Sequence, residues 1–412
     1  MTSFIIETHG SSYHHAQAAM MSHLLQQAKF TFTDIENADF VILHACSYKG
    51  LSTDKLLERI KTIETQHPYK MILVSGCVAQ SEPEKFRKYP LVGNSQWHHI
   101  VEVVEERLAN TFLKLRQGEE IPPLFSQHII GIEASIPLQH CILPCPEYHH
   151  TPSITHLKFY PLQEIQRALQ QCIATGAKMI TLTGIDVYSY SSENHTFPQL
   201  LQHLTTLPGD FQLRLESGNS EYLLRKTEDF ISAFSHHKFF HWLHLPIFSG
   251  SEKILAKLER PNIKAPLIDF IQNLRAAIPD ITISTDIVVG HPEETEQDHW
   301  ESLQLLRCIN PDNIILYQFS SPYTPNSLSE EIINQRLKTI YDMSQNMAKL
   351  QNERWLEWVG KVLVEKSGSQ SLARNSGYKK VLLDGEYRQG SRVKVRISRV
   401  TSSELKGETV EG

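Results

Sequence analysis

The sequence predicts an α/β protein with an N-terminal α/β domain, a partial (β/α)6 barrel and a small C-terminal antiparallel β-barrel. The chain has 412 residues, which is enough for two or three domains. Over most of its length, short β-branched segments alternate with segments of helical pattern, as in parallel sheets covered by helices. Residues 355–412 instead alternate polar and apolar positions between Gly-containing turns, which indicates antiparallel strands.

Residues 1–115 are expected to form the first domain, because buried strands and helices alternate there. The expected strands are 3–8, 39–44 and 70–76, and the expected helices are 15–28 and 99–115. Residues 116–133 are charged and contain the Pro122-Pro123 pair, so we expect a linker there.

Residues 134–345 are expected to form the barrel, because six further strand segments alternate with helices. The expected strands are 135–139, 179–184, 211–217, 241–247, 281–290 and 313–320. The expected helices are 161–175, 197–205, 224–234, 251–258, 265–277 and 295–308, with a last helix at 328–354. The absence of a glycine-rich dinucleotide fingerprint favours a barrel over a Rossmann sheet.

The composition is that of an ordinary globular protein. It is 41% hydrophobic and 21% charged, which excludes a disordered chain and a collagen-like fibre. Six cysteines are too few for a secreted disulfide scaffold. The first residues have no basic region or long apolar stretch, and no run of about 18 apolar residues occurs, so we expect no signal peptide and no membrane contact. We therefore expect a cytoplasmic protein whose cysteines are metal ligands, nucleophiles or packing residues.

The charge is distributed unevenly along the chain. Residues 355–412 carry 11 Lys and Arg against 7 Asp and Glu, whereas the remaining residues carry 29 against 39. Arg392, Lys394 and Arg396 alternate along one expected strand and so share a face. The candidate RNA-binding cations are Lys379, Lys380, Arg388, Arg392, Lys394, Arg396, Arg399 and Lys406. A row of cations on a small β-barrel fits phosphate-backbone binding, although a solvated strand face is the alternative.

Several short motifs, taken in order, resemble those of the tRNA methylthiotransferases. The loops ETHG (7–10), HACSYKG (44–50) and SGCVAQ (75–80) resemble the three motifs of the family's N-terminal UPF0004 domain. The segment CILPCPEY (141–148) lies where the family carries its radical SAM motif. Further blocks at 182–190, 244–255 and 285–295 match in order and spacing, and the tail resembles the RNA-binding TRAM domain. The archaeal and eukaryotic branch, which acts on threonylcarbamoyladenosine in tRNA, is the most similar.

The resemblance implies two [4Fe-4S] clusters and S-adenosylmethionine. In such proteins each cluster is held by three cysteine thiolates, which are soft anionic ligands for iron. One cluster cleaves S-adenosylmethionine to a 5′-deoxyadenosyl radical, and the auxiliary cluster supplies sulfur. The positions that correspond to S-adenosylmethionine-binding residues of the family are Thr183, Gly184, Asp186, Arg214 and Asn219. The alternative is that these residues only shape turns and fill the mouth of the barrel.

This chain departs from the family pattern at both cluster sites. The cysteines that remain are Cys46 and Cys77 at the auxiliary site and Cys141 and Cys145 at the radical SAM site. Ser11 and Tyr148 stand where the third cysteines are expected. His14 replaces an expected asparagine, and Phe248 replaces a glutamine in a cofactor-facing block. Cys172 and Cys308 match no family ligand position and are expected to be packing thiols.

These departures predict a degenerate homologue with no intact cofactor. We expect it to bind tRNA, to act as a non-catalytic partner subunit of an active methylthiotransferase, or both. The alternative is an active enzyme that acts on threonylcarbamoyladenosine in tRNA with substitute cluster ligands. A third interpretation is a zinc- or nucleotide-binding regulatory protein. Cys46, Cys77, His14 and His44 could form a Cys2His2 zinc site in it, because the three loops converge in the family fold.

Overall fold

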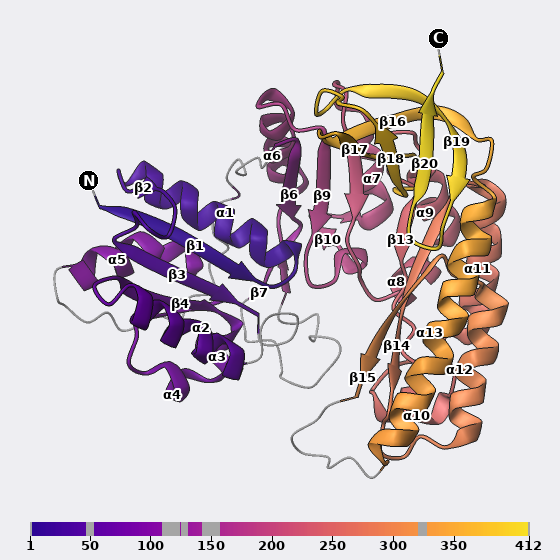
Figure 1. The fold of residues 1–412 in the computed structure, drawn as a ribbon, viewed down its shortest axis with the longest axis horizontal. Helices are drawn as coiled ribbons and strands as arrows, with labels where there is room; N and C mark the ends of the chain where they lie inside the picture. The colour runs from indigo at the N-terminus through magenta and orange to yellow at the C-terminus, as the bar shows by residue number, and fades with distance from the viewer. Residues whose placement is uncertain are drawn as a thin grey trace. The chain divides into compact units, whose positions relative to one another are not determined.

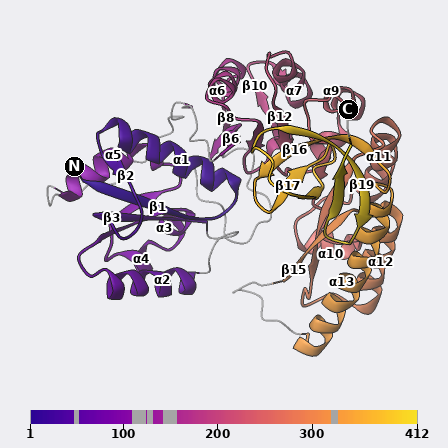
Figure 2. The same cartoon turned by 45° about the horizontal axis from the view of Figure 1, so that its top comes forward.

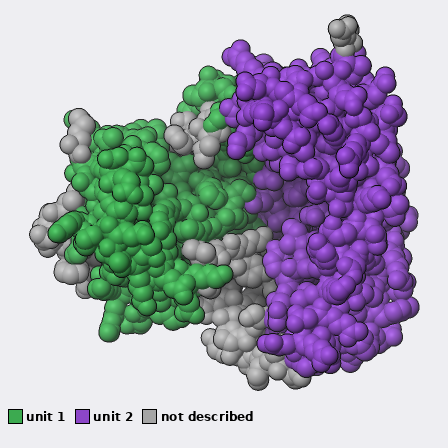
Figure 3. Space-filling model, viewed as in Figure 1, with its two compact units in different colours: residues 1–185, 190–194 green, residues 186–189, 195–412 purple. Residues whose placement is uncertain are grey.

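The computed structural model describes residues 2–46, 53–108, 124, 131–141, 157–319 and 328–410 (Figure 1). The chain divides into two compact units (Figure 3). Unit 1 consists of residues 1–185 and 190–194, and unit 2 consists of residues 186–189 and 195–412. This division does not coincide with any domain boundary expected from the sequence, and those boundaries remain predictions. Among the described residues, no helix combines the length and apolarity needed to cross a bilayer.

A five-stranded parallel sheet forms the first part of unit 1. Its order is β2-β1-β3-β4-β5. The strands are β1 (Ser3–His9), β2 (Thr31–Phe32), β3 (Phe40–Ala45), β4 (Met71–Gly76) and β5 (Leu91–Gly93). The three strands expected from the β-branched segments are therefore confirmed as β1, β3 and β4. In their register, Thr8 lies beside His44 and His44 lies beside Ser75, so the three strands end at the same edge.

Helices cover both faces of this sheet. The helices are α1 (Ser12–Gln27), α2 (Thr53–Gln66), α3 (Cys77–Ser81), α4 (Pro83–Phe86) and α5 (Ile100–Leu108), with a 3-10 turn at Trp97–His99. One core joins α1 and α5 to Phe40 and Ile42, and the other joins α2, α3 and α4 to Val41 and Leu43. Successive residues of β3 thus face opposite cores, as strand geometry requires. The sequence analysis predicted α1 and α5 but missed α2.

The rest of unit 1 begins the alternating barrel segment. Strands β6 (Glu133–Pro137) and β9 (Met179–Thr183) pair in parallel, and α6 (Leu162–Ala174) separates them in the sequence. Strands β7 (Gln139–Cys141) and β8 (Leu157–Phe159) form an antiparallel pair. Of the expected linker, only residues 124 and 131–133 lie within the described part of the chain.

Unit 2 continues the alternation of strands and helices. Its strands are β12 (Gln212–Leu215), β13 (Trp242–His244), β14 (Thr282–Val289) and β15 (Asn313–Gln318), and the last three pair in parallel. Its helices are α7 (Phe197–Thr205), α8 (Glu221–Leu224), α9 (Thr227–Phe234), α10 (Glu252–Lys257), α11 (Lys264–Ala277), α12 (Glu296–Ile309) and α13 (Glu330–Glu353). Short pieces are η3 (Val187–Ser189), β10 (Ser191–Ser192) and β11 (His195–Thr196). The strands and helices expected after residue 178 are confirmed, apart from small shifts at their ends.

Two helices of unit 2 begin with side-chain caps that share one carboxylate. The Thr295 hydroxyl accepts from the Asp298 amide, and Asp298 accepts from the Thr295 amide at 2.8 Å, so the pair closes a capping box at α12. The same carboxylate accepts from the Ser251 hydroxyl at 2.6 Å, and Ser251 caps α10. The starts of α10 and α12 are therefore fixed to each other.

A closed five-stranded barrel ends the chain (Figure 2). Its strands are β16 (Val359–Lys366), β17 (Gln370–Arg374), β18 (Lys380–Asp384), β19 (Arg392–Val400) and β20 (Leu405–Thr409). The order around the barrel is β16-β17-β18-β20-β19, and only the β18–β20 pair is parallel. Its core consists of aliphatic residues, namely Val362, Val364, Ala373, Val381, Leu383, Val395, Ile397 and Leu405, with Trp355. The expected small barrel is confirmed.

A buried ion pair holds α13 against the segment before α12. The Arg336 guanidinium donates to the Glu294 carboxylate and to the Glu294 carbonyl oxygen, both at 3.0 Å. The two side chains are only 6% and 2% exposed. Replacing Arg336 by Met leaves the Glu294 carboxylate buried without its cation, so we expect the free energy of unfolding of unit 2 to fall by about 3–5 kcal/mol.

The matched control is Lys338→Met in the exposed pair with Asp342, which should cost about 0–1 kcal/mol. Chemical denaturation of the full chain followed by tryptophan fluorescence measures both. Equal losses for the two variants would contradict the assigned role of the buried pair.

Candidate functional site

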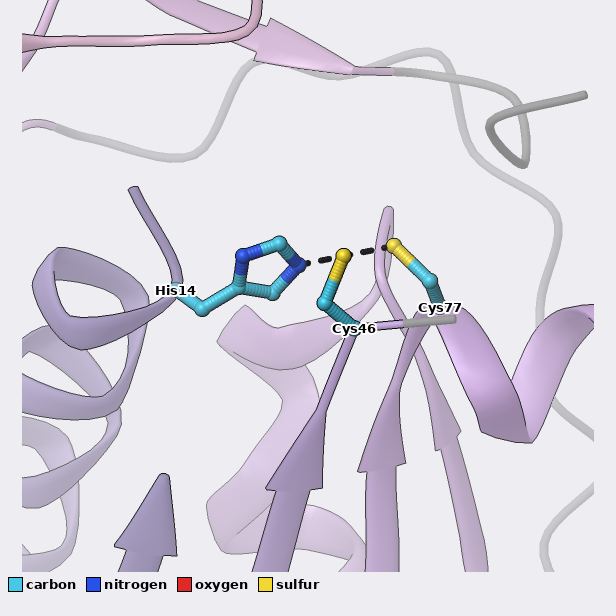
Figure 4. Close-up of side chains that lie close together, drawn as sticks. All are labelled: His14, Cys46 and Cys77. Carbon is cyan, nitrogen blue, oxygen red and sulfur yellow. Dashed lines mark hydrogen bonds between the residues drawn. The ribbon is translucent and has the colours of Figure 1, made fainter. Parts of the chain in front are cut away.

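Three residues from separate segments of the chain meet at the carboxyl edge of the unit 1 sheet (Figure 4). Cys46 follows the last residue of β3, and Cys77 follows the last residue of β4 and begins α3. His14 lies in the first turn of α1, just after β1. Because β1, β3 and β4 are parallel and end in register, their following residues reach the same place.

The ligand atoms of this triad are close together and buried. The His14 imidazole and the Cys46 and Cys77 sulfurs all lie within 4.8 Å of one another. The Cys77 Sγ lies 3.5 Å from His14 Nε2. The three residues are 5%, 6% and 2% exposed, in the order His14, Cys46, Cys77. Imidazole nitrogen and thiolate sulfur are the donors that zinc and other borderline-soft metals prefer.

Two glycines permit this close approach. Gly76 has a φ of +96°, and a Cβ there would lie 2.5 Å from the Ala45 carbonyl oxygen. Only glycine fits this turn, which places Cys77 beside the end of β3. A Cβ at Gly10 would lie 2.7 Å from His14 Cγ, so Gly10 leaves room for the imidazole.

Ser11 supports the triad without belonging to it. Its hydroxyl lies 3.2 Å from His14 Nδ1, the ring nitrogen opposite the one that approaches Cys77. Ser11 stands where the family pattern has a cysteine, and in the structure its side chain contacts the His14 ring.

His44 is held away from the triad. Its Nδ1 lies 3.1 Å from the Ser75 hydroxyl and its Nε2 lies 3.3 Å from the Gln17 side-chain oxygen. Burial holds the pKa of His44 well below its ordinary value, with His14 and His15 adding to the effect, so the ring is neutral. The Cys2His2 set considered from the sequence is therefore wrong in its fourth member, because the described residues bring together three of the four.

The second expected cluster site is described at one residue. Cys141 is the buried last residue of β7, and its amide donates to the Tyr13 hydroxyl at 3.3 Å. Burial raises the pKa of Tyr13 well above its ordinary value, and the neighbouring Cys141 adds to the shift. Cys145 and Tyr148 lie outside the described residues. Cys172 is buried in α6, as expected for a packing thiol, whereas Cys308 on α12 is exposed.

The five residues expected near S-adenosylmethionine are divided between the two units. In unit 1, Thr183 is fully buried, and a Cβ at Gly184 would meet the Gln139 side chain at 2.8 Å. In unit 2, the Arg214 guanidinium stacks on the rings of Trp242 and Tyr378. The sequence analysis gave no signal for these ring contacts.

Asp186 and Asn219 come together in unit 2. The Asp186 carboxylate accepts from the Asn219 amide at 2.9 Å and from the Ser189 amide at 3.3 Å. Burial nevertheless raises the pKa of Asp186 to about 6. Gly218 is required here, because a Cβ would lie 2.4 Å from the carboxylate. The carboxylate is thus placed by backbone donors.

Phe248 has an unusual backbone and a buried ring. Its φ is +66°, a left-handed value rarely adopted by bulky residues. The Arg260 guanidinium lies 4.4 Å from the centre of its ring. Phe248, Arg260 and Asn219 line a shallow pocket of unit 2. An aromatic ring therefore lines this pocket at the position where the family pattern has glutamine.

Most of the expected RNA-binding cations are paired within unit 2. Lys379 is buried against Asp312 at 2.9 Å, and burial lowers its pKa. The other pairs are Lys380–Glu404 at 3.3 Å, Arg392–Asp210 at 2.9 Å, Arg396–Glu357 at 3.8 Å and Lys406–Asp384 at 2.8 Å. Within the described residues, no ion pair involves Arg388, Lys394 or Arg399. Lys379 is therefore engaged by Asp312 within the fold, and its expected role in RNA binding stays a prediction.

Lys361 is a basic residue that the sequence analysis missed. It lies on β16 directly opposite Lys394 on β19, and both side chains are exposed. Two like charges in this cross-strand relation repel each other. Strand register, which the sequence does not reveal, creates this basic pair.

Comparison with known proteins identifies the class. Residues 3–93 match the family described as Uncharacterized protein family UPF0004, and residues 143–306 match the Radical SAM superfamily. A radical SAM methyltransferase structure, TsrM from Kitasatospora setae with cobalamin and a [4Fe-4S] cluster bound, has a TM-score of 0.58 at 11% identity. The match covers 81% of this chain and 78% of that one, so the two share a fold. The chain has the radical SAM fold preceded by a UPF0004 domain.

The curated relatives identify the family. The chain is 27% identical to the probable threonylcarbamoyladenosine tRNA methylthiotransferase of Methanothermobacter thermautotrophicus, over 97% of this chain and 98% of that one. It is also 27% identical to the threonylcarbamoyladenosine tRNA methylthiotransferase of Drosophila pseudoobscura pseudoobscura, over 98% and 77%. A tRNA-2-methylthio-N(6)-dimethylallyladenosine synthase of Chlorobium luteolum is 26% identical over 98% and 96%. Together with the two matched domains, these relatives support the tRNA methylthiotransferase family that the motifs predicted.

The triad does not have the spacing of a [4Fe-4S] cluster. In a cube each ligand binds a different iron, so the ligand atoms are spread around the whole cluster. Here the three donor atoms lie within 4.8 Å of one another, and one pair is 3.5 Å apart. That is the spacing of donors around one ion. The radical SAM site, described only at Cys141, gives no such test.

The buried Asp186 predicts a pH-dependent stability difference. Its pKa rises from 3.8 in the unfolded chain to about 6 in the fold, so ionisation destabilises unit 2 as the pH rises through this window. Asp186→Asn keeps an oxygen acceptor for both amides and removes the charge. We expect the variant to be more stable than the parent by up to about 3 kcal/mol above pH 6, and equally stable below pH 4.

Denaturation at both pH values measures this difference, with Asp269→Asn on the exposed side of α11 as the control. A loss of stability in Asp186→Asn at neutral pH would show that the fold requires the charged form.

Proposed function

We propose that this chain is a tRNA-binding methylthiotransferase homologue without radical SAM chemistry of its own. It acts by itself or as a non-catalytic subunit beside an active methylthiotransferase. The observation that carries this proposal is Tyr148 at the position of the third cluster cysteine, after Cys141 and Cys145. A phenolate is a hard oxygen ligand and replaces a soft thiolate on iron poorly.

Features of unit 2 support the loss of cofactor chemistry. The Phe248 ring and Asn219 line the same pocket, and the Arg260 guanidinium makes a cation–π contact with that ring. A buried aromatic ring cannot replace the hydrogen-bonding capacity of an amide.

The C-terminal barrel supports binding of a polyanion. Lys361 and Lys394 lie opposite each other on β16 and β19, and Arg396 follows two residues along β19. Their repulsion costs stability in the free protein, and neighbouring phosphates would relieve it. We propose this face, with Arg388 and Arg399, as the tRNA contact of a TRAM-like domain, and we exclude the buried Lys379 from it.

An active enzyme with substitute ligands is the second candidate. The observation that favours it is His14, which supplies a third donor beside Cys46 and Cys77. This candidate also requires a third ligand beside Cys141 and Cys145.

Reconstitution separates the two candidates. We expect the chain, purified without oxygen and supplied with iron and sulfide, to retain no more iron than Cys141→Ala/Cys145→Ala. We also expect no cleavage of S-adenosylmethionine under reducing conditions. Release of 5′-deoxyadenosine that the double variant abolishes would contradict the proposal and support an active enzyme.

The basic face is tested by salt dependence of tRNA binding. Each phosphate contact contributes about 0.7–0.9 to the slope of log affinity against log salt, so Lys361→Ala/Lys394→Ala should lower the slope by about 1.4–1.8. The control is Lys338→Ala/Lys349→Ala on the exposed face of α13. An unchanged slope in the barrel variant, with a changed slope in the control, would place the RNA elsewhere.

A further inference from the structure

We infer that His14, Cys46 and Cys77 bind a single tetrahedral metal ion of the zinc type, in place of the family's auxiliary cluster. The donor set is one imidazole nitrogen and two sulfurs, each buried. Zinc takes such mixed nitrogen and sulfur ligands. This inference concerns the sheet edge of unit 1 alone and holds whether or not the chain binds tRNA.

The spacing of the donors is that of one ion. With a Zn–S bond of about 2.3 Å and a Zn–N bond of about 2.0 Å, the N–S edge of a tetrahedron is ~3.5 Å and the S–S edge is ~3.8 Å. The Cys77 Sγ to His14 Nε2 distance is 3.5 Å. The remaining pairs lie within 4.8 Å, so small side-chain adjustments would bring all three donors to the distances of one ion.

The surroundings of His14 match those of a metal-bound imidazole. A ligand nitrogen at Nε2 requires the proton to be on Nδ1, where an acceptor fixes the tautomer and the ring orientation. The Ser11 hydroxyl lies 3.2 Å from Nδ1 and can accept that proton's hydrogen bond. Ser11 therefore acts as a positioning residue at the place where the family has a ligand.

The ion also resolves an electrostatic difficulty. Two thiolates buried at this site would carry uncompensated negative charge, which is costly in a low-dielectric interior. A divalent cation cancels both charges. Three protein ligands leave the fourth tetrahedral position for solvent or an incoming ligand, as in zinc sites that are not purely structural.

The test is metal titration of the full chain after chelator treatment, with Zn²⁺ and Co²⁺ as probes. We expect one ion per chain, with the charge-transfer absorption of cobalt bound to two thiolates and the intense visible bands of a tetrahedral site. Cys46→Ser, Cys77→Ser and His14→Ala should each weaken binding by more than ~100-fold. Ser11→Ala should weaken it by about 10-fold, which is the usual effect of losing an orienting partner.

His44→Gln is the matched control, because it removes a buried imidazole from the same sheet edge and should leave affinity unchanged. His14→Cys guards against misfolding of the alanine variant, since a third thiolate should raise the charge-transfer absorption about 1.5-fold. An unchanged absorption in His14→Cys, or parent-like affinity in His14→Ala, would overturn the assignment. So would reconstitution of an iron–sulfur cluster that depends on Cys46 and Cys77. None of these readouts depends on S-adenosylmethionine cleavage or tRNA binding.

Discussion

The common register of β1, β3 and β4 is the constraint on which the N-terminal site depends. Each of these strands is parallel to its neighbour, and the pairs His9–Ala45 and Ala45–Gly76 mark a shared final row. Whatever residues follow that row must meet at one edge. Sheet geometry, and not spacing in the sequence, therefore brings a histidine near the start of the chain to cysteines at positions 46 and 77. A shift of one residue in one strand would turn its side chains to the other face and dismantle the site.

A different kind of constraint governs the basic C-terminal segment. Asp312, which is fully buried, accepts from Arg354, from Lys379 and from the Ile283 amide, all at 2.9 Å. This carboxylate joins β14, the end of α13 and the C-terminal barrel within unit 2. Two of the cations near the barrel are thus committed to the fold. The net positive charge of the segment therefore overestimates the number of cations that a bound polyanion could contact. The position of each cation matters more than the number of cations.

The sequence allowed much of the fold to be predicted, because β-branched strands and helical segments alternate with clear boundaries. It missed α2, whose pattern is dominated by charge and which buries only Leu56, Ile60 and Ile63. It also missed β17 and β20, two short strands without a long apolar run.

Cys46 and Cys77 were found through the family motifs. The sequence could not show which of His14 and His44 lies beside the two cysteines. One is on a helix and the other on a strand, and only the tertiary structure shows which ring faces the thiols. Lys361 depends on strand register in the same way.

Helix geometry explains how Ser11 and His14 exchange roles. Ser11 occupies the N-cap position of α1, and His14 is the third residue of the helix. Side chains at these two positions lie together at a helix start, which is why capping boxes pair them. An imidazole at the second position can therefore reach the space that a thiol at the first would occupy, and the serine left behind can hold it there. The imidazole is larger than a thiol and brings its donor atom to 3.5 Å from the Cys77 sulfur. The change of one ligand thus favours an ion over a cluster, since the remaining thiols no longer stand far enough from the third donor to enclose a cube.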